Sequence, residues 1–279
     1  MAEKSLWERI QRIDRRVIYT IVLISTAIIL IRPLGLPVPI SESTRAVYDY
    51  IESLPAGSYI LWDIGIGGPT YAELAPASAA VMNHILIRPL KLVLVTLSAD
   101  APPLIDLMIK TLVKIPSDKS YGKDWVFMGY VAGAESGRAA LAKDFRSTVP
   151  KDYLGTPIDQ IPMLAGVTGA SNFKLVMDTT GGTDTVEHFI RQWVTPFGAK
   201  YASVLTAGIV PAAIAYYPRQ LFGFLYGARG GAEYELLIKM PGRNLMMTDA
   251  ISIVHVWFFI FVAIGNIGYI AIRMQKKKT

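Results

Sequence analysis

The chain has 279 residues, of which 52% are hydrophobic, and it carries a formal net charge of +6. This length and apolar content allow the chain to bury a full core. The excess positive charge lies near the two ends, in residues 1–16 and 273–279, and the residues between them are about neutral. A nucleic-acid binder needs basic residues clustered on its folded domain, so this distribution argues against nucleic acid as a partner.

The amide and thiol side chains are scarce. The chain has no cysteine, four asparagines and five glutamines. The lack of cysteine is compatible with a site outside the cytoplasm that uses no disulfides. Depletion of cysteine, asparagine and glutamine is also a tendency of heat-adapted proteins, which favours a thermophilic source.

The first apolar segment covers residues 17–31 and contains no charged residue. It is short for a membrane span, but the chain continues apolar past Arg32, whose long side chain can reach the interface. We therefore predict a transmembrane helix and its exit over 17–38. A cleaved signal peptide is the alternative, although no small-residue cleavage site follows the apolar run.

Between the two apolar ends, the pattern alternates between strand and helix. A helix at 41–54 begins with good N-cap residues and has apolar positions at helical spacing. Strands are then predicted at 58–66, 90–98, 124–131, 173–179 and 201–209, and helices at 70–87, 103–115, 135–148, 184–198 and 211–239. The strands are continuous runs rich in Val, Ile and Leu, so both faces of their sheet should be covered.

This alternation predicts an α/β domain over 40–245, with a doubly wound, mainly parallel, five-stranded sheet of the Rossmann-like or flavodoxin-like kind. Its one long irregular connection, 149–172, is too long for an ordinary loop. We expect that segment to be a lid, a partner surface or a disordered stretch.

Ligands of open parallel sheets bind outside the carboxyl ends of the strands. Five turns follow strands here, at 63–70, 98–103, 129–137, 178–184 and 206–211, and four of them contain glycine. Their exposed amides are suited to an anion. The candidate ligand-binding residues are Asp63, Gly65, Gly67, Gly68, Gly133, Asp178, Thr179, Thr180, Gly181 and Gly182.

The simpler interpretation of these turns is structural. A tight strand-to-helix turn needs glycine for unusual backbone angles, and the threonine and aspartate that follow are natural N-caps. None of the turns carries the G-x-G-x-x-G or the P-loop motif. Solvated turn aspartates are likewise the simpler alternative to a carboxylate cation site at Asp63, Asp100 and Asp178.

No complete catalytic constellation is visible, so we name no catalytic residue. Ser136 is displaced by one position from a nucleophile elbow. The three histidines fall in a predicted span or on predicted helices, and with neither cysteine nor paired histidine no metal site is predicted. The sequence specifies no cofactor.

The segment 211–240 carries Gly223, Gly227 and Gly231 at steps of four. On a helix this spacing puts all three on one face, where they allow the close approach of another backbone. The partner is either the domain's own sheet or another chain. Glu233 and Glu235 follow at i, i+2, so they diverge and form no carboxylate pair.

The second apolar segment covers residues 250–272 without a charge and predicts a full transmembrane helix. A buried core helix is the alternative. His255 and Asn266 lie near one face of it, and Gly265 is beside them. Polar groups in a span usually face protein, so this face is expected to contact the first span or a partner, unless the lipid edge tolerates it.

Arginines and lysines crowd the outer ends of both segments, which places both termini in the cytoplasm by the positive-inside rule. The expected organisation is a cell-membrane protein with two spans and an extracytoplasmic α/β domain. Its parts are a tail at 1–16, a span and exit at 17–38, the domain at 40–245, a span at 250–272 and a basic tail at 273–279.

Four segments together resemble an uncharacterised family of membrane-anchored Rossmann-like domains that has a GGAEYE-type segment. They lie at 40–58, 121–130, 152–162 and 225–235, and they extend over roughly 200 residues of the chain. The resemblance implies the fold and the anchoring, and it brings no activity, cofactor or site.

The leading hypothesis is a membrane-anchored, non-enzymatic component of a membrane complex, acting in ligand binding, as a scaffold or in assembly. Its expected partners are the lipid bilayer and a homo- or hetero-oligomer formed through the spans and the 211–240 region. The competing hypothesis is an enzyme for a phosphorylated or nucleotide-like substrate, held at the glycine turns with Asp63 and Asp178 as polar anchors and 149–172 as lid.

Overall fold

The computed structural model describes residues 13–276. The chain divides into two compact units: a helical unit that contains residues up to Pro37 and from Leu245 onward, and an α/β unit from Val38 to Asn244. The sequence predicts the α/β domain over 40–245, and nearly all of that range falls in the second unit. Most of the two terminal tails, at 1–12 and 277–279, lies outside the described residues.

The α/β unit is built on one parallel sheet of six strands in the order β3-β2-β1-β4-β5-β6. The strands are β1 (Tyr59–Ile64), β2 (Lys91–Thr96), β3 (Trp125–Tyr130), β4 (Phe173–Thr180), β5 (Tyr201–Leu205) and β6 (Gly223–Tyr226). This order is that of a Rossmann-like fold, in which the chain reverses direction along the sheet after its third strand. The five predicted strands are confirmed, and their runs are buried on both faces as expected.

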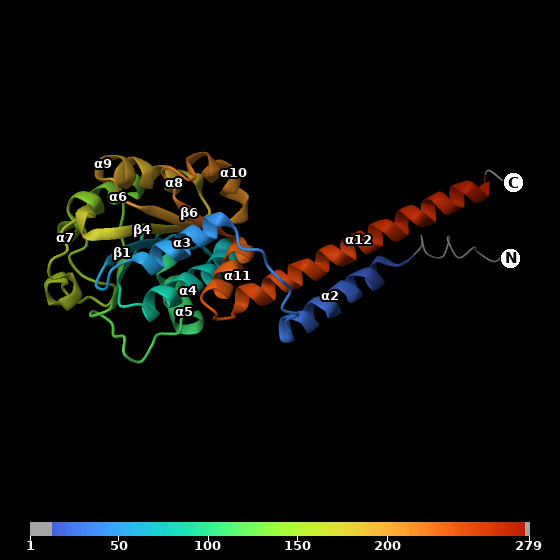
Figure 1. Cartoon of the computed structure of the whole chain (residues 1–279), viewed down its shortest axis with the longest axis horizontal. Coiled ribbons are helices and arrows are strands. Elements are labelled where there is room, and N and C mark those ends of the chain that lie inside the picture. The colour runs from blue at the N-terminus through green and yellow to red at the C-terminus, as the bar shows by residue number, and fades with distance from the viewer. Residues whose placement is uncertain (1–12, 277–279) are drawn as a thin grey trace. The chain divides into compact units, whose positions relative to one another are not determined.

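Helices cover both faces of the sheet (Figure 1). One face carries α3 (Glu42–Ser53), α4 (Tyr71–Ile87), α5 (Ala101–Leu112) and α11 (Gly227–Leu237). The other carries α6 (Ala134–Lys143), α7 (Phe145–Thr148), α8 (Thr183–Phe189), α9 (Thr195–Phe197) and α10 (Val210–Ala213). A separate apolar core fills the space on each side, because alternate residues of every strand point to opposite faces.

The sixth strand corrects the five-stranded prediction. Gly223–Tyr226 lies within the segment predicted as helix and pairs in register with Ala202–Leu205 of β5. A side chain at Gly223 would meet Val47 and the Ser43 carbonyl of α3, so glycine is needed for that helix to approach. The spacing of four between these glycines therefore does not reflect a shared helix face.

The other two glycines of that set have different tasks. Gly227 begins α11 with a φ of 54°, which favours glycine, and Gly231 lies inside α11 against the side chain of Asn244. Gly223, Gly227 and Gly231 thus belong to a strand, a helix start and a helix interior. The prediction that they share a helix face is wrong.

The long connection 149–172 is ordered and packs against its own domain. Buried apolar residues within it, among them Ile158, Leu164 and Val167, join the core on the α6–α8 side. Tyr153 N donates to Phe127 O of the edge strand β3 (2.9 Å), and Tyr59 Oη at the start of β1 donates to Met163 O (2.5 Å). The segment covers the β3 edge and the amino end of β1, so it is no lid over the carboxyl edge.

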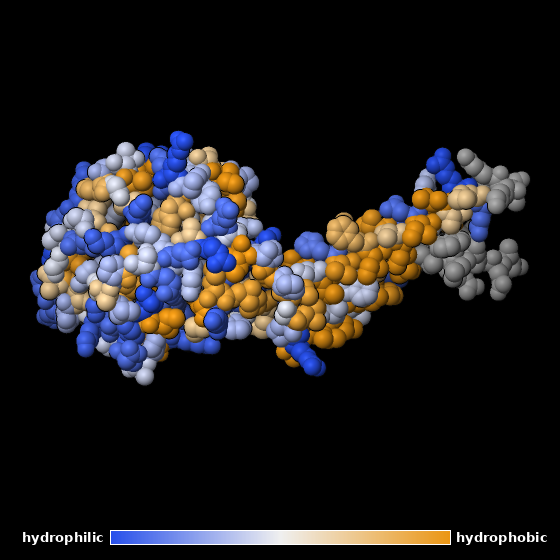
Figure 2. Space-filling view, viewed as in Figure 1, coloured by the Kyte–Doolittle hydropathy of each residue, from blue (hydrophilic) through white to orange (hydrophobic). Residues whose placement is uncertain are grey.

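The helical unit contains α2 (Arg15–Ile31) and nearly all of α12 (Arg243–Lys276), which run antiparallel beside each other. Trp257 Nε1 donates to Ser25 Oγ (3.0 Å), and the carboxylate of Asp249 accepts from the amides of Gly35 and Leu36 (2.8 and 3.2 Å). The exposed surface of this pair is apolar (Figure 2).

Within the described residues one helix, Arg243–Gln275, is long and apolar enough to cross a membrane by length and composition. This agrees with the predicted C-terminal span and corrects the two-span expectation. The helix α2 has 17 residues and is about 26 Å long at 1.5 Å per residue. That is less than the roughly 30 Å of a bilayer core, because the prolines after Arg32 end the helix.

Candidate functional site

The strand order reverses between β1 and β4, and this switch point is where ligands bind in open α/β sheets. The two strands are neighbours, with Asp63 directly opposite Asp178. Just beyond them, Gly65 N donates to Thr179 O (2.8 Å), so the glycine turn after β1 lies against the end of β4. The structure thus brings the turn at 65–68 together with the turn at 181–182.

Gly65 is required by close packing, and Gly181 lies in a tight environment. A side chain at Gly65 would meet Thr179 O at 2.9 Å and Ser98 Oγ at 3.3 Å, and one at Gly181 would meet the methyl groups of Thr70 and Thr206. Gly68 differs from them, because it is exposed and a Cβ atom there would have no other atom within 4 Å. The turns are therefore close-packed underneath and open at Gly68.

Asp63 is fully buried beneath these turns and is paired. Arg138 of α6 donates from Nη2 to Asp63 Oδ2 (2.6 Å), and Leu97 N donates to Asp63 Oδ1 (3.0 Å). Burial raises the pKa of Asp63, and the neighbouring Arg138 guanidinium opposes that rise. The guanidinium also lies over the Phe189 ring, 5.2 Å from its centroid.

Asp178 is also fully buried but has fewer donors. Tyr201 Oη donates to Asp178 Oδ1 (2.9 Å), whereas Asp178 Oδ2 has no hydrogen-bond partner among the described residues. Burial, with a smaller contribution from the charge of Asp63, raises the pKa of Asp178 to about 7. Both aspartates are thus interior groups beneath the turns.

A chain of polar contacts leads from this pair to the surface. Arg138 Nη1 lies 3.3 Å from His188 Nδ1, and His188 Nε2 lies 3.3 Å from a carboxylate oxygen of Glu135. Arg191 forms two hydrogen bonds to Glu135 (2.8 and 3.0 Å), and these, together with a hydrogen bond from Gln192 (2.9 Å), lower the pKa of Glu135 to about 2. Sequence reasoning missed Arg138, His188 and Tyr201, because each comes from an element remote in the chain.

The predicted threonines have structural contacts. Thr179 Oγ1 bonds to Trp62 Nε1 (3.0 Å) and Ser78 Oγ (2.9 Å) on the α4 side of the sheet. Thr180 Oγ1 accepts from Gly182 N (2.9 Å) and shapes the turn. Gly133 precedes α6 with a φ of 100°, beyond the edge strand β3 and two strands away from β1. It does not belong to the switch-point cluster.

The GGAEYE segment forms a second polar cluster on α11. Glu233 accepts from the N–H and the hydroxyl of Ser41, the N-cap of α3 (3.0 and 2.6 Å). Glu235 accepts from the amide of Gly242 and from the amide and side chain of Asn244, at the start of α12 (2.9, 3.0 and 2.6 Å). The two acids diverge as predicted from their spacing, and each one binds the beginning of a different helix.

The polar residues of the second apolar segment face outward. His255 and Asn266 are exposed on α12, and nothing lies within 4 Å of a side-chain position at Gly265. Trp257, in contrast, lies on the face that contacts α2. The expected contact of His255 and Asn266 with the first apolar segment is therefore not found.

No group of three or more metal-ligating side chains occurs within residues 13–276. His84 is buried between Tyr234 Oη and Glu52 (both 2.8 Å), and burial lowers its pKa. It joins α4 to α3 and α11 and leaves no open coordination position. No family model matches the chain, and no curated protein or solved structure matches it significantly.

Proposed function

We propose that the chain is a membrane-anchored, non-enzymatic component whose α/β unit binds a small ligand at the switch point. The observation that carries the proposal is the hydrogen bond from Gly65 N to Thr179 O, which holds the turn after β1 against the end of β4 where the strand order reverses. Exposed Gly68 and Gly181 at these turns leave backbone amides accessible to an anionic group.

The condition of the two acids supports binding rather than catalysis. An enzyme at this edge would use a side chain within hydrogen-bond reach of its substrate. Asp63 is held by Arg138, and Asp178 lies fully buried behind Tyr201. Both acids support the turns from below and do not anchor the ligand.

A substitution at Gly68 tests the binding site. Gly68→Asp adds a negative charge at an exposed position that has space for it, so the fold tolerates the change while an anionic ligand is repelled. The matched control is Gly166→Asp, which is equally exposed and unobstructed but lies in the 149–172 segment. The probes are ADP and inorganic pyrophosphate, added to the full chain in mild detergent.

A rise in the melting temperature with either probe is expected for the wild type and for Gly166→Asp, and it should be lost in Gly68→Asp. Equal shifts in all three proteins would place the ligand elsewhere, and the absence of any shift would refute an anion site here. Chemical conversion of ADP during the incubation would favour the competing enzyme hypothesis.

The anchoring part of the proposal concerns α12 and its partners. In this proposal α12 crosses the bilayer, and the shorter α2 crosses beside it together with the apolar residues that follow it up to 38. Both termini are then cytoplasmic and the α/β unit is extracytoplasmic. The outward-facing His255 and Asn266 support assembly with further helices, because polar groups in lipid favour protein contacts.

Extraction in a gentle detergent followed by mass measurement tests the assembly. We expect a species heavier than the 30.6 kDa single chain, and a lone 30.6 kDa species would contradict the proposal. The variant His255→Leu/Asn266→Leu should shift the population toward the single chain. Protease digestion tests the topology. We expect the protease to cleave the α/β unit in intact cells that lack an outer barrier, and we expect the unit to be protected in inverted vesicles.

A further inference from the structure

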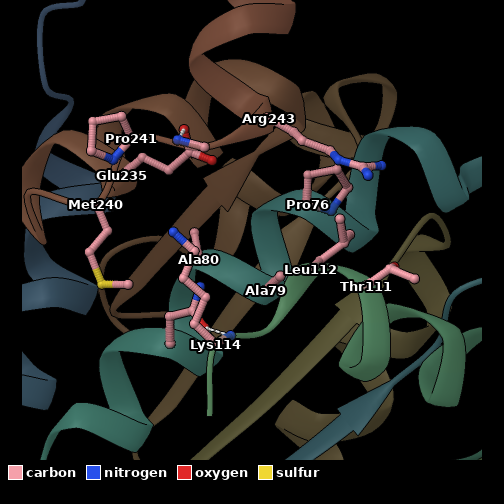
Figure 3. Close-up of a pocket in the computed structure, with 12 residues that line it drawn as sticks. Pro76, Ala79, Ala80, Thr111, Leu112, Lys114, Glu235, Met240, Pro241 and Arg243 are labelled. Atoms are coloured by element: carbon pink, nitrogen blue, oxygen red, sulfur yellow. Dashed lines mark hydrogen bonds between the residues drawn. The ribbon is translucent and has the colours of Figure 1, made fainter. Parts of the chain in front are cut away.

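A pocket of about 170 Å³ lies on the α4 side of the domain, away from the switch-point turns. Its walls come from α4, α5 and the connection between α11 and α12 (Figure 3). The floor is apolar, with Ala79, Ala80 and Leu112, and Arg243 lines the pocket from the first position of α12. Since a water molecule occupies about 30 Å³, there is room for a group of several heavy atoms.

One amide donor in this pocket has no hydrogen-bond partner. Asn83 is 8% exposed and lines the pocket, and its Oδ1 accepts from Lys114 N (2.7 Å). That bond fixes which end of the amide is oxygen, so the NH₂ group is the free end. Within the described part of the chain Nδ2 forms no hydrogen bond. Because Nδ2 is not among the fully buried unpartnered atoms, it keeps some accessible surface, and an acceptor in the pocket can form a hydrogen bond with it.

Two cations accompany this donor. Arg243 and Lys114 line the pocket, and neither side chain forms an ion pair or hydrogen bond with another residue of the described chain. The one acid of the pocket, Glu235, is already surrounded by the N–H groups of Gly242 and Asn244. The pocket therefore offers donors and positive charge, while its negative charge is internally satisfied.

We infer that this pocket binds a phosphate group, with Asn83 Nδ2, Lys114 and Arg243 as its donors. A phosphate presents several acceptor oxygens to such donors, and arginine and lysine both bind it. Either a soluble phosphate ester or the headgroup of an anionic lipid supplies this chemistry. The site is distinct from the proposed switch-point site, because its lining residues come from other elements.

The test measures phosphate binding by the full chain in mild detergent. The probes are inorganic phosphate, glycerol 3-phosphate and phosphatidylglycerol, with phosphatidylcholine as the zwitterionic lipid. Binding is followed by native mass spectrometry for the lipids and by calorimetry for the soluble ions. Asn83→Asp keeps the oxygen that accepts from Lys114 N and replaces the free donor by an anionic oxygen, so it isolates Nδ2.

The second variant, Lys114→Gln/Arg243→Gln, removes both cations. Its matched control is Lys174→Gln/Lys200→Gln, which removes the same charge from two exposed lysines at the amino ends of β4 and β5. Each charge-assisted hydrogen bond should be worth about tenfold in affinity or more. We expect both pocket variants to weaken binding by at least about tenfold, and the control pair to bind like the wild type.

Binding of phosphatidylglycerol without binding of the soluble ions would assign the ligand to a lipid headgroup, and binding of soluble phosphate would assign a soluble ester. Either result supports the site if the pocket variants no longer bind that probe. Equal loss in the pocket and control variants would show nonspecific charge attraction and overturn the inference, as would the absence of binding by all probes. Gly68→Asp should leave this binding unchanged, which separates it from the switch-point proposal.

Discussion

The α/β unit buries two pairs of acids, and the hydrogen-bond donors around them differ most between Asp178 and the two glutamates of α11. Asp63 and Asp178 lie opposite each other on adjacent strands, and Asp178 has one hydrogen-bond donor and one unpaired oxygen. Glu233 and Glu235 lie on α11, and each accepts from several N–H or O–H groups. Burial alone therefore does not define the role of an acid, because the number of donors aimed at it decides what its charge costs.

The donor-rich pair has a mechanical consequence. The chain passes from the first apolar segment into the α/β unit near Ser41 and leaves it again near Asn244. Glu233 holds the first of these points and Glu235 the second, so one helix secures both. The donor-poor acid, Asp178, lies in contrast beside Asp63 on the neighbouring strand, below the turns of the proposed ligand site. Three substitutions test this contrast.

Removal of Glu235 should have the largest effect. Glu235→Ala leaves three N–H donors of Gly242 and Asn244 without their acceptor, and at about 1–3 kcal/mol for each we expect the free energy of unfolding to fall by about 3–5 kcal/mol. Thermal unfolding of the full chain in detergent, followed by circular dichroism, measures the loss. The matched control is Glu73→Ala, whose carboxylate accepts from one amide, that of Ala207 (2.8 Å). Equal losses in the two variants would contradict the importance of donor number.

Asp178→Asn should raise the free energy of unfolding, whereas Glu235→Ala lowers it. The pKa of Asp178 is about 7 in the folded protein and about 3.9 when unfolded, so the folded state holds a proton that the unfolded state has released. Wild-type stability should therefore fall as the pH rises from about 4 to about 7, by up to about 1.4 kcal/mol per pH unit, and then level off.

The asparagine variant lacks this dependence, so we expect it to be more stable than the wild type at pH 8 by about 2–4 kcal/mol and similar to it near pH 4. Unfolding curves at pH 4, 6 and 8 give the comparison. Asp63→Asn is the control, since it leaves the buried Arg138 guanidinium without its ion pair and should destabilise the protein at pH 8. Parallel pH profiles of stability for the wild type and Asp178→Asn would contradict the raised pKa of Asp178 as the cause of the pH dependence.

The smallest of the three effects is expected at Gly231. A methyl group there would overlap the Asn244 side chain, which Glu235 holds in place. Alanine gains about 1 kcal/mol in a helix, but overpacking costs about 1–3 kcal/mol, so a net loss of about 1 kcal/mol is expected for Gly231→Ala. Gly166→Ala, with open space around it, should change stability little. A stabilised Gly231→Ala variant would show that Asn244 moves freely.

Much of the architecture could be predicted because its signals are local. Continuous runs of Val, Ile and Leu between helical patterns identified five of the six strands, and the uncharged stretch at 250–272 identified the long apolar helix. β6 was missed because four residues flanked by glycine carry little pattern, and because their pairing with β5 lies outside the segment. The candidate turns were located by a general rule on strand ends, and the strand order brings two of them together.

The α/β class, the strand-end positions of Asp63 and Asp178 and the apolar C-terminal helix all follow from the order of residues along the chain, so they could be read without a structure. Two other contacts form only once the chain is folded. Arg138 pairs with Asp63, 75 residues away, and Glu233 contacts Ser41, 192 residues away. The same holds for Asn83, Lys114 and Arg243, which line one pocket. Burial and pairing depend on which elements meet across the sheet, and no local spacing specifies that meeting.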